Sequence, residues 1–211
     1  EAIISADIAF LCLPDDAARE SVSFIENENT VVIDTSTAHR TLDDWAYGFP
    51  ELSQKHREKI VNSKRIAVPG CHASGFISLV YPLIEAGALD GTENLSCFSL
   101  TGYSGGGKKM IADYEEEPDE LLGAPRQYGL TQTHKHLKEM VKISGLKSAP
   151  AFCPVVSNFY SGMEVTVPIF KSDLKNDFNI EKIKELYKNK YNSPLVSYCD
   201  DSEDGFLSAG I

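Results

Sequence analysis

Near its start the chain alternates apolar runs with a helical pattern. Residues 6–14 are almost continuously apolar, which predicts a strand buried on both faces of a parallel sheet. Asp15 and Asp16 then offer a helix N-cap, and the helix is expected to run through residues 17–25. Residues 30–36 repeat the apolar strand pattern. Together these segments predict a strand–helix–strand unit with parallel strands.

A second strand and helix follow a longer polar segment. Residues 38–62 have the pattern of a loop and helix insertion, which holds the single tryptophan, Trp45. Residues 66–68 form a short apolar strand pattern. A Pro-Gly turn separates it from residues 71–84, whose apolar positions recur at helical spacing. A helix is therefore expected to begin at residue 71, just after a strand.

The rest of the chain contains both strand and helix patterns. Strand patterns occupy residues 95–103, 153–156 and 162–170, and helical patterns occupy a segment beginning near His134 and residues 180–191. The glycine triplet at residues 105–107 is expected to form a flexible turn. The acidic run at residues 114–120 is expected to form a solvated loop.

The first strand–helix–strand unit lacks a glycine-rich turn before its helix. A dinucleotide-binding fold carries such a turn in its first strand-to-helix connection. The sequence therefore predicts a partial Rossmann-type domain over residues 1–70, followed by a second domain over residues 71–211 that is incomplete at its C-terminus. On this interpretation the chain is truncated at both ends.

Composition narrows the class of partner. The 211 residues are 42% hydrophobic and 24% charged, and 31 acidic residues against 20 Lys and Arg give a net charge of −11. This charge argues against binding to nucleic acid or to an anionic membrane surface. The five cysteines are widely spaced and form no C-x-x-C pair, so neither a disulfide framework nor a metal site is expected. A reducing, cytoplasmic setting is expected.

Cys71 is the strongest candidate for chemistry, because it lies where a strand gives way to a helix N-terminus. The unpaired N–H groups and the helix dipole there favour a thiolate. A thiolate in this position is a candidate nucleophile for an acyl or carbonyl carbon. The alternative is a small residue that only packs against the turn.

His134 and His136 are spaced i, i+2, which places them on different faces of a helix and disfavours a two-histidine metal site. Glu139 shares the face of His136 and is expected to orient that imidazole and raise its pKa. His136 then becomes a candidate acid–base group near neutral pH. The alternative is a pair of solvated histidines in a first helical turn.

Other groups could hold an anion. Arg40 follows a strand end, where open α/β sheets place their ligands, and could bind a carboxylate or phosphate. It could equally be a surface arginine. The glycine triplet with Lys108 could present N–H groups to a phosphate, although a linker could carry the same residues. We assign structural roles to His39, His56 and His72.

The order of these segments resembles that of the N-acetyl-gamma-glutamyl-phosphate reductases, in particular their shorter, second type. The resemblance covers most of residues 6–170. One departure is Lys138, where family members usually have proline. The segments that carry the resemblance are ADIAFLCLPDD from residue 6, DTSTAHR from 34, WAYGFPEL from 45, PGC from 69, TGYSGGGK from 101, YGL from 128 and HKH from 134.

The resemblance implies an arginine-biosynthesis enzyme. Its reaction would be the NADPH-dependent reduction of N-acetyl-glutamyl 5-phosphate to N-acetyl-glutamate 5-semialdehyde and phosphate, through a cysteine thioester. The second domain would be an α+β catalytic domain like that of the phosphorylating aldehyde dehydrogenases. Besides NADPH, the enzyme would bind the small acyl phosphate substrate and further copies of the same chain in a homo-oligomer, but no nucleic acid or membrane.

The resemblance also implies roles for individual residues. Cys71 would be the nucleophile, His136 its acid–base partner and Glu139 the group that orients the histidine. His134 and Arg40 would contact the phosphate or carboxylate of the substrate. NADPH would contact Pro14, Ser36, Gly105 and Gly106, and no metal is implied.

Two alternatives stay open. An enzyme like aspartate-semialdehyde dehydrogenase uses the same thiol chemistry, although the WAYG and HKH segments favour the N-acetyl-glutamyl enzyme. A non-catalytic remnant, or interaction module, could keep the fold without the cofactor site. As it stands, this chain is expected to bind NADPH poorly or not at all, because the pyrophosphate lacks the helix N-terminus that usually receives it.

Overall fold

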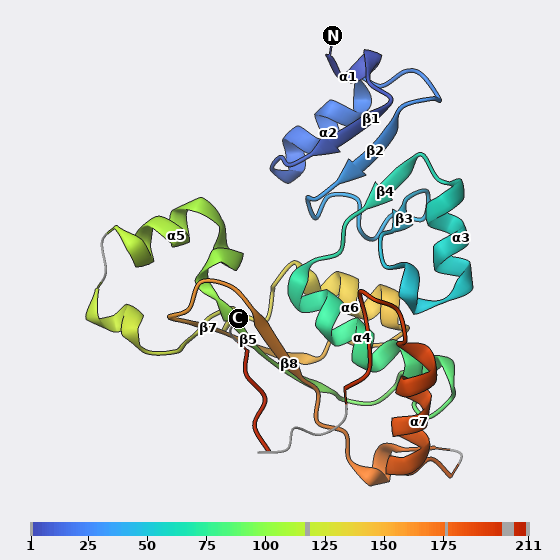
Figure 1. Cartoon of the computed structure of the whole chain (residues 1–211), viewed down its shortest axis with the longest axis vertical. Helices are drawn as coiled ribbons and strands as arrows, with labels where there is room; N and C mark the ends of the chain where they lie inside the picture. The colour runs from blue at the N-terminus through green and yellow to red at the C-terminus, as the bar shows by residue number, and fades with distance from the viewer. Residues whose placement is uncertain (1, 117–118, 176, 200–204, 210–211) are drawn as a thin grey trace.

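The computed structural model describes residues 2–116, 119–175, 177–199 and 205–209. Within these ranges the strands form two four-stranded sheets (Figure 1). Two helices, α4 and α6, pack against each other, and Figure 1 shows them between the first sheet and the second. None of the helices described is long and apolar enough to cross a membrane.

The first sheet is parallel throughout and has the strand order β1-β2-β4-β3. Helix α2 connects β1 to the parallel strand β2, which confirms the predicted strand–helix–strand unit. The short strand β3, which the sequence did not predict, lies within the insertion and pairs with β4. The elements are α1 Ala2–Ser5, β1 Ile8–Leu11, α2 Asp15–Ser23, β2 Val31–Asp34, β3 Ala46–Tyr47, α3 Gln54–Asn62 and β4 Arg65–Ala67.

Two details of this unit differ from the prediction. Strand β1 is not buried on both faces: Ala9 and Leu11 are buried, whereas Ile8 and Phe10 are 54% and 67% exposed. The alternating burial arises because the described elements cover only one face of the strand. The acidic pair Asp15 and Asp16 lies in the first turn of α2, and no side chain caps the helix.

The second sheet is mixed and has the order β6-β7-β5-β8. Strand β5 pairs in parallel with β7 and antiparallel with β8, and β6 is antiparallel to β7. A parallel sheet followed by a mixed one confirms the expected α/β and α+β parts, while the domain boundary at residue 70 stays a prediction. The elements are α4 Cys71–Glu85, β5 Ser96–Gly102, α5 Gly107–Glu115, β6 Arg126–Gln127, α6 His136–Ser144, β7 Ala151–Ser157, β8 Met163–Thr166 and α7 Ile180–Lys190.

The largest core cluster lies between this sheet and its helices. Phe76 and Leu83 of α4 pack there with Met140 of α6 and Phe152 of β7. Burying large apolar side chains of this kind stabilises a fold by about 1.5–3 kcal/mol each. The core therefore fixes the position of both helix N-termini, at residues 71 and 136.

The glycine triplet and the acidic run are more helical than expected. Residues 103–106 form a 3₁₀ turn, and Gly107 begins α5, which runs to Glu115. The prediction of a flexible turn at 105–107 is therefore wrong. The expected solvated loop is helical over its first two residues, and residues 117 and 118 lie outside the described ranges. Helix α6 begins at His136, so His134 precedes it, and Gly145 (φ 88°) ends it in the left-handed region as predicted.

Candidate active site

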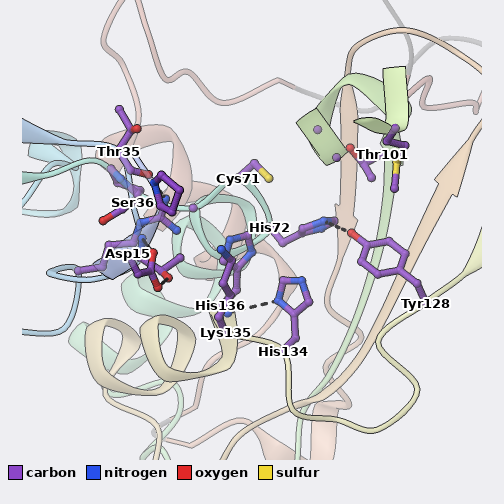
Figure 2. Close-up of a pocket in the computed structure, with 18 of the residues that line it drawn as sticks. Asp15, Thr35, Ser36, Cys71, His72, Thr101, Tyr128, His134, Lys135 and His136 are labelled. Carbon is purple, nitrogen blue, oxygen red and sulfur yellow. Dashed lines mark hydrogen bonds between the residues drawn. The ribbon is translucent and has the colours of Figure 1, made fainter. Parts of the chain in front are cut away.

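A pocket of about 550 Å³ opens between the first sheet and the N-termini of α4 and α6 (Figure 2). The carboxyl ends of β1 and β2 line one side of it, and residues before α5 line another. Ligands of open α/β sheets bind at such strand ends. Of the nine predicted site residues, Glu139 does not line this pocket. The other eight do: Pro14, Ser36, Arg40, Cys71, Gly105, Gly106, His134 and His136.

Cys71 is the first residue of α4, directly after Gly70 at the N-cap position. The backbone N–H groups of Cys71 and His72 favour the thiolate, as the sequence predicted. However, loss of solvent around the sulfur outweighs them and raises the pKa of the thiol, even though the residue as a whole is exposed. The predicted thiolate at neutral pH is therefore wrong for this structure, and Cys71 needs a base.

This reversal has a measurable consequence. We expect the rate at which iodoacetamide modifies Cys71 to rise with pH around a midpoint above about 8.5, the ordinary value for cysteine. Peptide mass spectrometry over a pH series measures this midpoint for each cysteine. The same protein in denaturant is the control, because unfolding returns the thiol to water. A midpoint below that of the denatured protein would mean that the helix N-terminus dominates after all.

His136 begins α6 and is 7% exposed. Burial, followed by the neighbouring His134, His72 and Arg40, lowers its pKa to about 3. The imidazole is therefore neutral near pH 7 and able to accept a proton. Its Nδ1 is buried and has no hydrogen-bond partner among the described residues, which leaves Nε2 as the nitrogen that reaches the pocket.

Gly70 makes the approach of His136 to the Cys71 turn possible. A Cβ at this position would lie 2.4 Å from Nε2 of His136 and 2.5 Å from Nη1 of Arg40, far inside van der Waals contact. The backbone angles of Gly70 are ordinary for any residue, so the requirement for glycine is purely steric. The Pro-Gly turn was visible in the sequence, but the side chains that need this space were not.

Glu139 does not orient His136. Its Oε1 accepts a hydrogen bond from Nη1 of Arg40 at 2.8 Å, and its Oε2 accepts from the hydroxyl of Tyr47 and the backbone N–H of Gly70, each at 3.0 Å. The expected raising of the His136 pKa by this carboxylate is likewise wrong, because the shift is downward. Glu139, 1% exposed, instead ties α6 to Arg40 and to the turn that carries Cys71.

Arg40 lines the pocket, but it donates its hydrogen bonds to other groups of the protein. Its Nη1 donates to Glu139, its Nη2 donates to the carbonyl of Thr35 at 2.7 Å, and its buried Nε has no hydrogen-bond partner among the described residues. The guanidinium therefore holds α6 to the end of β2. Its predicted contact with a substrate anion stays a prediction.

The segment before α6 adds two groups to the pocket. The Nδ1 of His134 accepts a hydrogen bond from the backbone N–H of His136 at 3.3 Å, and burial lowers the pKa of His134. Lys135 also lines the pocket; hydrogen bonds from Thr37 and, to a smaller extent, the charge of Lys135 lower the pKa of Asp15, another pocket residue. Lys135 carried no recognisable signal in the sequence, whereas Lys108, the predicted anion contact, does not line this pocket.

His72 has a larger part than the structural role we predicted. It is 3% exposed, its Nδ1 lies 2.6 Å from the hydroxyl of Ser99, and its Nε2 lies 2.7 Å from the hydroxyl of Tyr128. Tyr128 and His72 both line the pocket beside Cys71 (Figure 2). The sequence signal for Tyr128 was its place in the YGL segment, which carried no chemistry by itself.

Three imidazoles gather here, with ring centroids 4.7–6.0 Å apart at His72, His134 and His136. Burial and the charge of His134 lower the pKa of His72 to about 4, so this ring too is neutral near pH 7. No group of three metal-binding side chains is arranged to hold an ion in the described part of the chain.

The residues predicted to contact NADPH lie on two sides of the pocket. Pro14 directly precedes α2, and the Ser36 hydroxyl, in the loop after β2, donates at 2.6 Å to Asp34, the last residue of that strand. A Cβ on Gly105 would lie 3.3 Å from Oγ1 of Thr101, and a Cβ on Gly106 would lie 2.4 Å from Sδ of Met110, so both positions need a glycine or a shift of the neighbouring side chain. Parallel strand ends that face a glycine-rich backbone across a pocket fit a dinucleotide.

Two protein-family models match separate parts of the chain. Residues 71–205 match the family model described as "Semialdehyde dehydrogenase, dimerisation domain", and residues 1–60 match "Semialdehyde dehydrogenase, NAD binding domain". The N-acetyl-gamma-glutamyl-phosphate reductases of Brucella ovis and Sinorhizobium medicae are each 45% identical to the chain over 190 residues. That alignment covers 89% of the chain and 61% of each relative, and it confirms the resemblance drawn from the sequence.

Solved structures share the fold at lower identity. Aspartate semialdehyde dehydrogenase II from Vibrio cholerae aligns with a TM-score of 0.65 at 17% identity, over 87% of this chain and 60% of that one. A probable aspartate-semialdehyde dehydrogenase from Pseudomonas aeruginosa gives 0.65 at 12% identity, over 96% and 68%. These likenesses concern the fold alone. Because one family model matches more than half of its residues and a second matches most of the rest, the chain belongs to the semialdehyde dehydrogenase family.

Proposed function

We propose that the protein carrying this chain reduces N-acetyl-glutamyl 5-phosphate to N-acetyl-glutamate 5-semialdehyde with NADPH, as a step of arginine biosynthesis. The chain spans 61% of the length of its curated relatives, whose names describe such a reductase. The observation that carries the proposal is the placement of the neutral His136 against Gly70, the residue before Cys71, in a pocket at the strand ends that both side chains line.

Cys71 supplies the nucleophile. Since its pKa is raised, the sulfur attacks as its proton leaves for Nε2 of His136. A bond forms between the sulfur and the acyl carbon, and the bond from that carbon to the phosphate oxygen breaks. Phosphate departs with the bonding electrons and takes its proton from water. Cys71 is left as a thioester and His136 as an imidazolium.

NADPH, when bound, supplies the hydride that reduces the thioester carbon. Pro14, Ser36, Gly105 and Gly106 would hold it, on the two sides of the pocket already described. His136 then returns its proton to the departing sulfur, which regenerates the thiol. Because burial makes the imidazolium unfavourable, the proton transfer back to sulfur is driven by the same desolvation that kept the ring neutral.

The substrate is an anion at both ends, so it needs cations. Lys135 lies at the pocket with His134 beside it, and we assign them the phosphate. Arg40, already paired with Glu139, would contact the α-carboxylate through guanidinium N–H groups that have no partner among the described residues, such as that of Nε. This division leaves the acyl carbon next to Cys71 at the base of α4.

The wider setting belongs to the same proposal. We infer a homo-oligomer, supported by the match of residues 71–205 to a family model described as a dimerisation domain. We place the domain boundary at residue 70, in the gap between the two family matches. A cytoplasmic location is supported by five cysteines that are all free.

Substrate choice tests the proposal. We expect the protein carrying this chain to oxidise N-acetyl-glutamate 5-semialdehyde in the reverse direction, with phosphate and NADP, at a kcat/KM at least about 100-fold above that for aspartate semialdehyde. Initial rates of NADPH formation measure both. A preference for aspartate semialdehyde would support the alternative enzyme. Turnover of neither, without NADPH binding, would support a non-catalytic remnant.

A further inference from the structure

We infer that Ser99 and His72 fix the direction of the Tyr128 hydroxyl proton, so that Tyr128 donates a hydrogen bond to the acyl oxygen of the substrate. On this inference Tyr128 is a further catalytic residue, and His72 and Ser99 are positioning residues. The direction of the proton stands on the structure alone, whereas its acceptor rests on the proposed function.

The buried end of the network is Ser99, a residue of β5 that is 1% exposed. Within the described part of the chain, the hydrogen-bond partner of its hydroxyl is Nδ1 of His72, at 2.6 Å. A buried hydroxyl places its hydrogen on an available acceptor. The Ser99 O–H therefore donates, and Nδ1 of His72 accepts.

This bond sets the tautomer of His72. A neutral imidazole carries one N–H, and the ring is neutral because it is almost fully buried. With Nδ1 as the acceptor, the proton is on Nε2. Nε2 then donates to the hydroxyl oxygen of Tyr128, at 2.7 Å. The opposite tautomer would leave the buried Ser99 hydroxyl as a donor without an acceptor.

The hydroxyl proton of Tyr128 is therefore left free at the pocket. Because the Tyr128 oxygen accepts from His72, its own O–H stays available, and no other acceptor for it occurs among the described residues. Figure 2 shows this hydroxyl meeting His72 on the side of the pocket where Cys71 also lies. Burial raises the pKa of Tyr128 to about 12, so the group keeps its proton and acts as a donor.

A donor at this place has a use in the reaction. Attack by Cys71 moves negative charge onto the acyl oxygen, and a preorganised O–H lowers the energy of that state. The backbone N–H of Gly70, which could otherwise serve, is already bonded to Glu139. A neutral phenol suits the task because it gives a hydrogen bond without attracting the phosphate away from Lys135.

The first test reads the tautomer directly. In the full-length protein with ¹⁵N-labelled histidine, and without substrate, we expect His72 to show a protonated Nε2 and an unprotonated Nδ1 near pH 7. Its assignment comes from loss of the signal in His72→Gln. A protonated Nδ1 would overturn the inference, whatever the substrate of the protein proves to be.

The second test links the tautomer to the reaction. We expect Tyr128→Phe to lower kcat by about 100-fold, the usual effect of removing one oxyanion donor, with a much smaller change in KM. Tyr103→Phe is the matched control, because that hydroxyl bonds to Glu115 and does not line the pocket. An unchanged kcat in Tyr128→Phe would overturn the donor role.

A double-mutant cycle separates positioning from mere packing. Ser99→Ala should lower kcat in the wild-type background and have no further effect once Tyr128→Phe is present, while Ser99→Thr should retain most of the activity. Equal losses in both backgrounds would show a structural effect and overturn the positioning role. Absence of turnover with any acyl phosphate would count against the proposed function, while the tautomer measurement would still decide the proton direction.

Discussion

Replacing Cys71 with alanine should abolish formation of the semialdehyde while leaving the Kd for NADPH nearly unchanged. The sulfur forms the covalent link to the acyl group, and the neighbouring groups that bind, donate or accept protons cannot replace it. The dinucleotide contacts proposed at Pro14, Ser36, Gly105 and Gly106 do not involve the thiol. Product formation measured by mass spectrometry, together with a fluorescence titration of NADPH, separates the two effects.

The matched control for this experiment is Cys199→Ala. Cys199 is exposed like Cys71, but it does not line the pocket. Its loss should leave both kcat and NADPH binding unchanged. Substantial turnover by the Cys71→Ala protein would rule out the covalent route. Loss of NADPH binding in the same variant would show instead that the thiol supports the cofactor site.

Changing Glu139 to glutamine should lower the free energy of unfolding by about 3 kcal/mol, the size expected when one partner of a buried ion pair is removed. The side chains of Glu139 and Arg40 are 2% and 8% exposed, so the guanidinium would stay buried without its counter-charge. The amide would also bond less well to Tyr47 and to the N–H of Gly70. Urea unfolding measures the change.

Two further variants sharpen this result. Glu185→Gln is the control, because Glu185 is exposed on α7, and its replacement should leave stability unchanged. The double variant Arg40→Met with Glu139→Gln should be more stable than Glu139→Gln alone, because it removes the uncompensated charge. If the double variant lost as much stability as Glu139→Gln and Arg40→Met lost when measured singly and added together, the two side chains would not be coupled.

Regular elements were predictable from local pattern. The helix at Cys71 follows from apolar spacing after a Pro-Gly turn, and the end of α6 follows from a glycine that adopts a positive φ at residue 145. The error at β1 has a tertiary cause. An apolar run has the same sequence whether one face or two are covered, so the exposure of Phe10 could not be read from it.

The chemistry of the site was harder to predict than its membership. The sequence located Cys71 and His136, but the signs of their pKa shifts depend on how much water each group loses in the folded chain. Helix-terminal position favours a thiolate, and desolvation overrides it. No local pattern reports that balance.

Hydrogen bonds between segments that are distant in the sequence could not be predicted either. Glu139 lies three residues after His136 on one helix, yet its bonds go to Arg40, Tyr47 and Gly70, which come from separate segments. His72 follows the nucleophile directly and has no motif of its own. Its role appears only when β5 brings Ser99 to one nitrogen and the YGL segment brings Tyr128 to the other.

The proposed reaction depends on acylation of Cys71 by the substrate. The most direct measurement mixes the full-length protein with N-acetyl-glutamyl 5-phosphate in the absence of NADPH, stops the reaction in acid and maps the peptides by mass spectrometry. We expect an N-acetyl-glutamyl thioester on the peptide that contains Cys71, and its loss when NADPH is added before the acid. An unmodified Cys71, or an acyl group on another residue, would show that Cys71 is not the acyl acceptor.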